Sequence, residues 1–206
     1  MKSSHRPIIE ENNMKPLLIL ILSLCFTLTA FGQKPEYPDS GFTNKAEAKN
    51  LYKDSLKEGK WIEYLNYLDY FVEVSKSDFY ILTIYKQGKP YGIRRSYYKS
   101  GKLKEVTPYN NGCKNGISKE YFESGKISKL TPYTDGKING VVKSYYENGK
   151  ICAEIPFNTG IVNGMEKCYF KNGKLSIEIP FENGKEGVSK CYDIKGNVIT
   201  CPKLEL

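Results

Sequence analysis

The chain has 206 residues, a net charge of +8, and a composition that is 40% hydrophobic and 26% charged, which suits one globular domain or two small ones. It holds 17 Tyr and 18 Gly but one Trp and three Met, a balance that favours β-strands and turns over helices. The single histidine, His5, lies near the N-terminus, and this argues against Ser-His-Asp or Cys-His catalysis and most zinc sites.

Residues 1–33 have the features of a secretory signal peptide. Lys15 precedes an apolar run over residues 16–31, and the small residues Ala30 and Gly32 stand where a signal peptidase would recognise them. We expect Met14 to be the true start, because residues 1–13 are polar. A retained membrane anchor is the alternative, but a spanning helix needs about 20 apolar residues. The sequence therefore predicts export to the periplasm, the cell surface or the medium, with no membrane span after cleavage.

Residues 34–58 are predicted to be a linker followed by a short helix that caps the first strand. Asn44 and Glu47 have a spacing similar to that of a helix capping box. The apolar side of this helix would comprise Ala46, Leu51, Tyr52 and Leu56. The alternative is a degenerate strand over residues 52–56.

A 24-residue period fills the rest of the chain, which we take as one repeat domain over residues 59–206. The recurring residues are Gly88, Gly112, Gly136, Gly160 and Gly184, together with Pro108, Pro132, Pro156 and Pro180. Self-similarity at a fixed interval indicates a repeat architecture. The units begin near residues 59, 88, 112, 136, 160 and 184. The first is degenerate, with extra residues around 66–77, and the last has lost one residue.

Each unit has the pattern of one β-hairpin. In the unit that begins at 136, residues 141–146 are β-prone, Asn148-Gly149 favours a tight turn, and residues 151–155 return until Pro156 ends the strand. The equivalent turn glycines are Gly101, Gly125, Gly149 and Gly173. Successive hairpins are expected to pair edge to edge. The predicted fold is all-β, an elongated single-layer antiparallel meander of stacked hairpins.

The units resemble MORN repeats in their bacterial variant form. The resemblance rests on the aromatic-aromatic-x-(Asn/Ser)-Gly-Lys cores at 121–126, 145–150 and 169–174 and on the Asn-Gly-x-x-x-Gly spacing. It covers residues 88–200 closely and 59–87 weakly. It implies a twisted single-layer sheet, and proteins of this family mostly serve as interaction or scaffold modules. A bacterial subset, the YwqK type, is described as antitoxin, although a signal peptide departs from a cytosolic antitoxin.

Strand alternation places a basic column and a tyrosine column on one face of the predicted sheet. The basic column is Arg95, Lys119, Lys143, Lys167 and Lys190, and the tyrosine column is Tyr97, Tyr121, Tyr145, Tyr169 and Tyr192. These columns could bind anionic partners or stack on sugar rings. The structural interpretation, which we favour, is that solvated lysines cover the rings and discourage sheet aggregation, while the aromatic rings form the core.

At most one disulfide is predicted, and the candidate pair is Cys191 and Cys201, which flank the last hairpin turn. Cys168 and Cys191 occupy equivalent positions of neighbouring units and would lie about 9–10 Å apart, beyond the about 7 Å that a disulfide allows.

These features predict an exported, non-enzymatic module that binds or scaffolds an unidentified protein partner. The alternatives are binding of envelope glycan or anionic lipid, and neutralisation of a toxin; nucleic acid is not expected. We predict no catalytic residues, metal site or cofactor, and Glu154 and Glu178 are interpreted as surface pattern rather than an acid-base pair. An asymmetric active site could form at the 66–77 insertion, near Asp69, Tyr70, Glu73 and Asp78, but we interpret this insertion as a longer hairpin loop.

Overall fold

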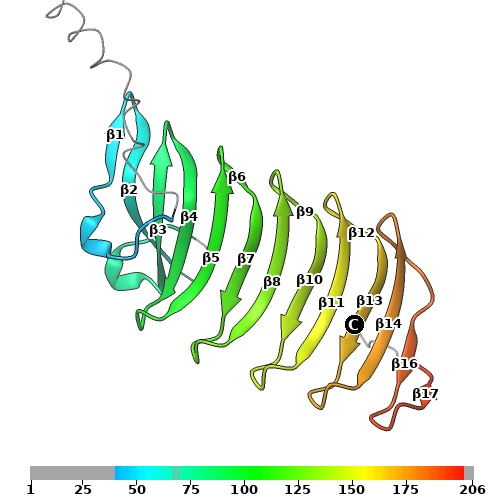
Figure 1. Ribbon diagram of the computed structural model, residues 1–206. Coiled ribbons are helices and arrows are strands. Elements are labelled where there is room, and N and C mark those ends of the chain that lie inside the picture. Colours follow the sequence, from blue (N-terminus) through cyan, green and yellow to red (C-terminus); the bar gives the residue numbers. More distant parts are fainter. Residues whose placement is uncertain (1–39, 67, 69, 202–206) are drawn as a thin grey trace, which may run out of the picture. The chain divides into compact units, whose positions relative to one another are not determined.

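The computed structural model describes residues 40–66, 68 and 70–201, and its strands form one antiparallel sheet (Figure 1). The predicted signal peptide at 1–33 and residues 34–39 of the predicted linker lie outside this part of the chain. Within it, no helix is long and apolar enough to cross a membrane.

The strands follow one another across the sheet in chain order, so the fold is an open meander. The N-terminal part contains β1 (Leu51–Lys53), β2 (Leu56–Leu65), β3 (Phe79–Lys86), β4 (Lys89–Tyr98) and β5 (Leu103–Asn110). The middle contains β6 (Cys113–Lys114), β7 (Gly116–Tyr121), β8 (Ile127–Thr134), β9 (Lys137–Ile138), β10 (Gly140–Tyr145) and β11 (Ile151–Asn158). The C-terminal part contains β12 (Ile161–Val162), β13 (Gly164–Tyr169), β14 (Leu175–Glu182), β15 (Lys185–Glu186), β16 (Lys190–Tyr192) and β17 (Val198–Ile199).

Each repeat is a hairpin, and from the unit that begins at 112 onward its first strand is interrupted once. In the third regular unit, β9 and β10 both pair with β8 and are separated by Asn139, whose N–H donates to the carbonyl of Pro132 at 3.0 Å. The return strand β11 then pairs with β10 on one side and with β13 of the following unit on the other. The predicted all-β meander of hairpin repeats is thereby confirmed.

Tight turns at both ends of the strands set the length of the repeat. In the turn between β10 and β11, Gly149 has a φ of 85°, and the N–H of Tyr146 donates to the carbonyl of Lys150 at 2.9 Å. In the turn between β11 and β12, at the other end of the strands, Thr159 and Gly160 have φ values of 51° and 90°, as a two-residue type I′ turn requires. The N–H of Gly160 donates to the carbonyl of Ile138 at 2.7 Å, so this turn also joins its hairpin to the preceding one.

The predicted capping helix is reduced to a single 3-10 turn, η1 (Lys45–Glu47), with Asn44 as its N-cap. The helical prediction fails beyond it because Asp54 and Ser55 adopt φ values of 50° and 63° and reverse the chain between β1 and β2. The region that was expected to continue the helix is therefore a hairpin, in keeping with the alternative of a degenerate strand. The side chain of Asn50 bonds both the N–H and the carbonyl of Ile62, so it closes part of the free edge of β2.

Two clusters of buried apolar residues lie at the N-terminal end of the sheet, one on each face. On one face Phe42 packs against Leu82 and Ile84. A second buried cluster, formed by Leu65, Phe79 and Ile81, lies elsewhere on the same strands; strand alternation assigns it to the other face. Farther along the sheet, the first face carries the tyrosine column and is called the tyrosine face. The opposite face carries the buried hydroxyl residues Ser96, Thr107, Ser118 and Thr131 and is called the threonine face.

Candidate functional site

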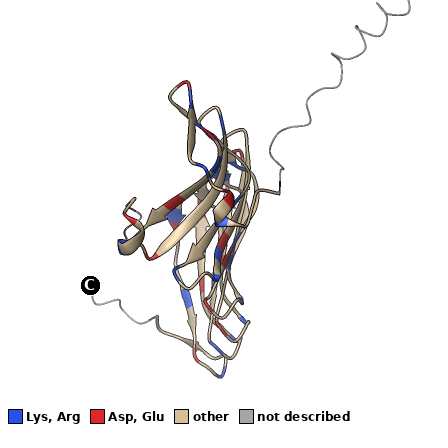
Figure 2. Ribbon diagram, turned by 90° about the vertical axis from the view of Figure 1, so that its left-hand side faces the viewer, with Lys and Arg blue, Asp and Glu red and all other residues tan. Residues whose placement is uncertain are grey.

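The predicted basic column is interleaved with acidic residues in the later repeats. Strand register places Lys143, Glu154, Lys167, Glu178 and Lys190 opposite one another on successive strands of the tyrosine face. The ammonium of Lys143 lies 3.0 Å from the carboxylate of Glu154. Figure 2 likewise shows basic and acidic residues intermixed along the sheet. This part of the column therefore alternates in sign and is not a basic stripe.

The tyrosine hydroxyls of the later repeats are engaged by the same acidic residues. Tyr169 donates to Glu154 at 2.8 Å, and Tyr192 donates to Glu178 at 2.6 Å. Hydrogen bonds from Lys143 and Tyr169 lower the pKa of Glu154, while Glu154 raises the pKa of Lys143. Burial and then the bond to Glu154 raise the pKa of Tyr169 to about 12. At this end of the sheet, Glu154 and Glu178 thus supply the partners of both the lysine and the tyrosine side chains.

The first two members of the basic column have different surroundings. The guanidinium of Arg95 donates to the carbonyl of Ser40 at 2.7 Å, so it holds the N-terminal segment on the sheet. Lys119 lies opposite Val106 on one neighbouring strand and Leu130 on the other, and its side chain is exposed. The position that holds Glu154 and Glu178 in the later repeats is thus occupied by the apolar residues Val106 and Leu130 on either side of Lys119.

A row of exposed and half-buried apolar residues runs beside the charged row on the tyrosine face. It alternates apolar residues with the recurring prolines: Ile93, Pro108, Ile117, Pro132, Val141, Pro156, Met165 and Pro180. Val188 holds the equivalent sequence position after β15. Ile117 is 53% exposed and Val188 is 91% exposed. The sequence signal is the aliphatic residue that follows the second glycine of each unit, a position that was not among the predicted binding residues.

The tyrosine face binds a short piece of its own chain at the N-terminal end. Phe42 is 5% exposed and fills the space above Leu82 and Ile84. Gly41 lies so close to the sheet that a Cβ atom there would stand 2.1 Å from the carbonyl oxygen of Ile93. Residues 40–42, called the N-terminal strap below, thus show that this face accepts a short segment of chain, held by an aromatic side chain and a backbone carbonyl.

The threonine face has a polar pocket of about 420 Å³ at the same end of the sheet. Its lining includes Glu63, Arg94, Glu105 and Glu120 beside buried apolar residues. Each carboxylate has a basic neighbour: Glu63 pairs with Lys57, Glu105 lies 3.6 Å from Arg94, and Glu120 lies 3.7 Å from Lys129. The pocket is therefore charge-compensated, which is typical of a structural network.

Glu105 is the centre of that network. Burial would raise its pKa, but hydrogen bonds from the hydroxyls of Thr107 and Ser118 and the charge of Arg94 together lower it below the ordinary value. The carboxylate thus joins three strands of the threonine face and satisfies two buried hydroxyls.

The 66–77 insertion folds back onto β2 as a loop, as predicted. It contains a single 3-10 turn, η2 (Val74–Lys76), and Phe71 pairs with Leu65 in an isolated bridge. Tyr70 and Glu73 are exposed, the N–H of Asp78 donates to the carbonyl of Leu65 at 2.9 Å, and Asp69 lies outside the described residues. No group of three or more His, Cys, Asp or Glu in the described part of the chain could hold a metal ion.

Comparison with known families agrees with this architecture. The family model described as MORN repeat variant matches residues 90–111, 114–135, 138–159 and 162–183. Residues 90–183 belong to the MORN repeat variant family. The resemblance inferred from the sequence is thereby confirmed over these four repeats. No curated protein matches the chain.

Each MORN repeat of this chain corresponds to one hairpin of the sheet. The matched segment 114–135, for example, begins in β6 and ends just after β8. The hairpins at either end, β2–β3 and β16–β17, lie outside the matched segments but continue the same sheet. The array is therefore longer in the structure than the four MORN repeats alone.

The last hairpin after the MORN repeats is closed by a disulfide. Cys191 is bonded to Cys201, with their Cα atoms 5.1 Å apart. Cys113 is an exposed free thiol, whereas Cys152 and Cys168 are half-buried free thiols. Burial raises the pKa of Cys168, and the nearby carboxylate of Glu166 raises it further, so this thiol stays protonated at neutral pH.

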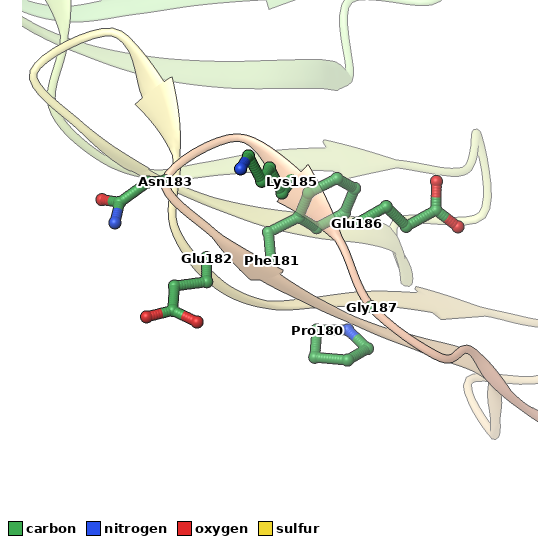
Figure 3. Close-up of a pocket in the computed structure, with 7 residues that line it drawn as sticks. All are labelled: Pro180, Phe181, Glu182, Asn183, Lys185, Glu186 and Gly187. Carbon is green, nitrogen blue, oxygen red and sulfur yellow. The ribbon is translucent and has the colours of Figure 1, made fainter.

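A shallow depression lies where the last MORN repeat meets the final hairpin (Figure 3). Its lining residues are Pro180, Phe181, Glu182, Asn183, Lys185, Glu186 and Gly187. The carboxylates of Glu182 and Glu186 point in different directions in Figure 3, so they do not form a carboxylate pair. The depression gives no arrangement of catalytic groups.

Proposed function

We propose that this chain is a protein-interaction module that binds its partner on the tyrosine face. The observation that carries the proposal is the exposed apolar row between Ile117 and Val188. Exposed apolar surface that is continuous along a face is typical of interaction sites in soluble proteins. The repeat array presents this row on an extended platform, as other repeat proteins do.

The contacts on this face support a protein partner over an anionic lipid or a glycan. Binding to an anionic surface needs a row of unpaired basic charges, but Lys143 is paired with Glu154, and Glu178 stands opposite both Lys167 and Lys190. A stacked sugar needs a free aromatic ring, whereas the tyrosines are half-buried and Tyr169 and Tyr192 bond acidic neighbours. Toxin neutralisation is a narrower form of the same proposal and requires a one-to-one protein complex.

We further propose that the module works outside the cytoplasm, in the envelope or beyond it. The proposal rests on the signal-like segment at residues 1–33 and on the disulfide between Cys191 and Cys201. Structural disulfides persist in oxidising compartments and are rare in the cytosol.

Site-specific photo-crosslinking in living cells tests the binding face. A photoreactive amino acid is placed at Ile117 or Val141 on the tyrosine face, and at Lys129 on the threonine face as the matched control. We expect one crosslinked protein from the first two positions and none from the third. Equal crosslinking from both faces, or crosslinking from Lys129 alone, would overturn the proposal. Capture of polysaccharide or lipid instead of protein would transfer the function to the glycan or lipid alternative.

A further inference from the structure

The inference concerns one part of the tyrosine face, beside the N-terminal strap. It is formed by Val106, Pro108, Ile117, Lys119, Leu130 and Pro132, which lie on β5, β7 and β8. We call this set the 106–132 patch. It combines aliphatic side chains with one exposed ammonium, and strand pairing places no carboxylate directly opposite Lys119.

The patch continues the surface that already holds the N-terminal strap. Leu82, Val106 and Leu130 occupy the same position in three successive hairpins, because each lies directly opposite the residue of the basic column. Phe42 of the strap packs against Leu82, and the carbonyl of Ser40 accepts a hydrogen bond from Arg95. Arg95 is the repeat equivalent of Lys119. The patch therefore repeats the features that bind the strap, one and two hairpins farther along.

The same position changes character in the next two repeats. Glu154 and Glu178 replace the aliphatic residue there, and Glu154 pairs with Lys143. The face is thus apolar with an uncompensated Lys119 over the 106–132 patch, and charge-compensated beyond it. A ligand that needs both apolar contact and a cation fits the patch and not the later repeats.

We propose that the 106–132 patch binds an extended segment of the partner protein, in which an acidic residue contacts Lys119 and apolar residues contact Val106 and Leu130. The inference rests on the proposed function, because it identifies the chemistry of the partner for the same face. Neighbouring strands lie about 4.8 Å apart, and an extended chain advances about 3.3 Å per residue. A segment that crosses from β5 to β8 therefore places its apolar residues about three residues apart, with the acidic residue between them.

Selection from a phage-displayed library of random linear peptides, with the chain itself as bait, tests the proposal. We expect enrichment of an Asp or Glu flanked by apolar or aromatic residues. Binding of a selected peptide is then measured by fluorescence polarisation. The variant Leu130→Glu should weaken it by about tenfold or more, because it removes an apolar contact and pairs Lys119 with a carboxylate. This variant is expected to fold, because Glu154 and Glu178 occupy the same position in the repeats that follow.

Charge reversal provides the matched comparison. Lys119→Glu should abolish the preference for acidic peptides, whereas Lys190→Glu, the same change at an exposed position of the compensated row, should leave binding unchanged. Circular dichroism melts of the three variants check that each is folded.

Two results would overturn the assignment. The first is a selection that enriches no acidic-apolar motif. The second is a selected peptide whose affinity is the same for the chain and for Leu130→Glu. If such a peptide still crosslinks to Val141, which lies on the tyrosine face outside the patch, the proposed function stands and only this patch is removed. A dimer in sedimentation that Leu130→Glu dissociates would assign the patch to a second copy of the chain.

Discussion

The hydroxyl of Tyr146 lies 2.6 Å from the carbonyl oxygen of Tyr169, so one hairpin of the array is bonded to the next by a side chain. Tyr98 makes the same bond to the carbonyl of Tyr121 at 2.8 Å. Phe122 and Phe170 occupy the equivalent position in the alternate hairpins and have no hydroxyl. Nearest-neighbour bonds of this kind add to the strand pairing that holds a repeat array together.

Tyr146→Phe should lower the free energy of unfolding by about 1 kcal/mol, the usual net value of one hydrogen bond. Chemical denaturation of the two proteins measures the difference. The reciprocal change, Phe122→Tyr, adds a hydroxyl at an equivalent position and serves as the control, which should not lose stability. An unchanged denaturation midpoint for Tyr146→Phe would contradict the role of this bond.

Acid should destabilise the protein in a way that depends on Glu105. Its folded-state pKa lies below the ordinary value of 4.5, so the carboxylate contributes stability above about pH 4.5 that is lost as the pH falls through the folded pKa. Glu105→Gln should therefore flatten the acid limb of a plot of unfolding free energy against pH.

Glu166 is the control for this measurement. Burial raises its pKa, so it favours the folded state at low pH rather than at neutral pH. Glu166→Gln should not reduce the loss of stability in acid. If both variants had the same profile as the unmodified chain, the network around Glu105 would not be the source of the acid sensitivity.

Two glycines of the third regular unit should differ in their tolerance of alanine. Gly149 has a φ of 85°, and a Cβ atom there would meet no other atom within 4 Å, so alanine should cost about 1–2 kcal/mol from the left-handed backbone alone. Gly140 has a φ of 115°, and a Cβ atom would stand 3.1 Å from the ring of Pro132. Thermal melts should therefore show a larger loss for Gly140→Ala than for Gly149→Ala, and the reverse order would contradict this packing.

Reduction of the Cys191–Cys201 disulfide should loosen the last hairpin and leave the preceding repeats folded. Each hairpin contacts its neighbours alone, and a disulfide of this kind contributes about 2–3 kcal/mol. Hydrogen exchange with and without reductant measures the effect, which should be confined to β16, β17 and the turn between them. Protection lost throughout the array would show that the hairpins unfold as one unit. Alkylation without reductant should label Cys113 most readily, because that thiol is exposed.

The repeat architecture could be predicted from the sequence because its signals are local and periodic. Asn148 and Gly149 specify a turn from neighbouring residues, and the same signal recurs every 24 residues. The pairing of Cys191 with Cys201 also follows from their positions around one turn. The helical prediction near Asn44 was wrong beyond residue 47 because it ignored the turn at Asp54 and Ser55, whose positive φ values suit a hairpin.

The character of the binding face could not be predicted in the same way. The sequence gives the positions of the basic residues, but the net charge around each lysine depends on the residue opposite it. Lys143 faces Glu154 and Lys119 faces Leu130, and both pairs are set by the register between strands.

The sequence by itself determined the period, the hairpins and their turns, since each depends on residues close together in the chain. The tertiary structure decided which charges cancel, which apolar residues stay exposed and where the strap of residues 40–42 lies. Those properties arise from contacts between residues far apart in sequence, such as Ser40 with Arg95, and no periodicity encodes them.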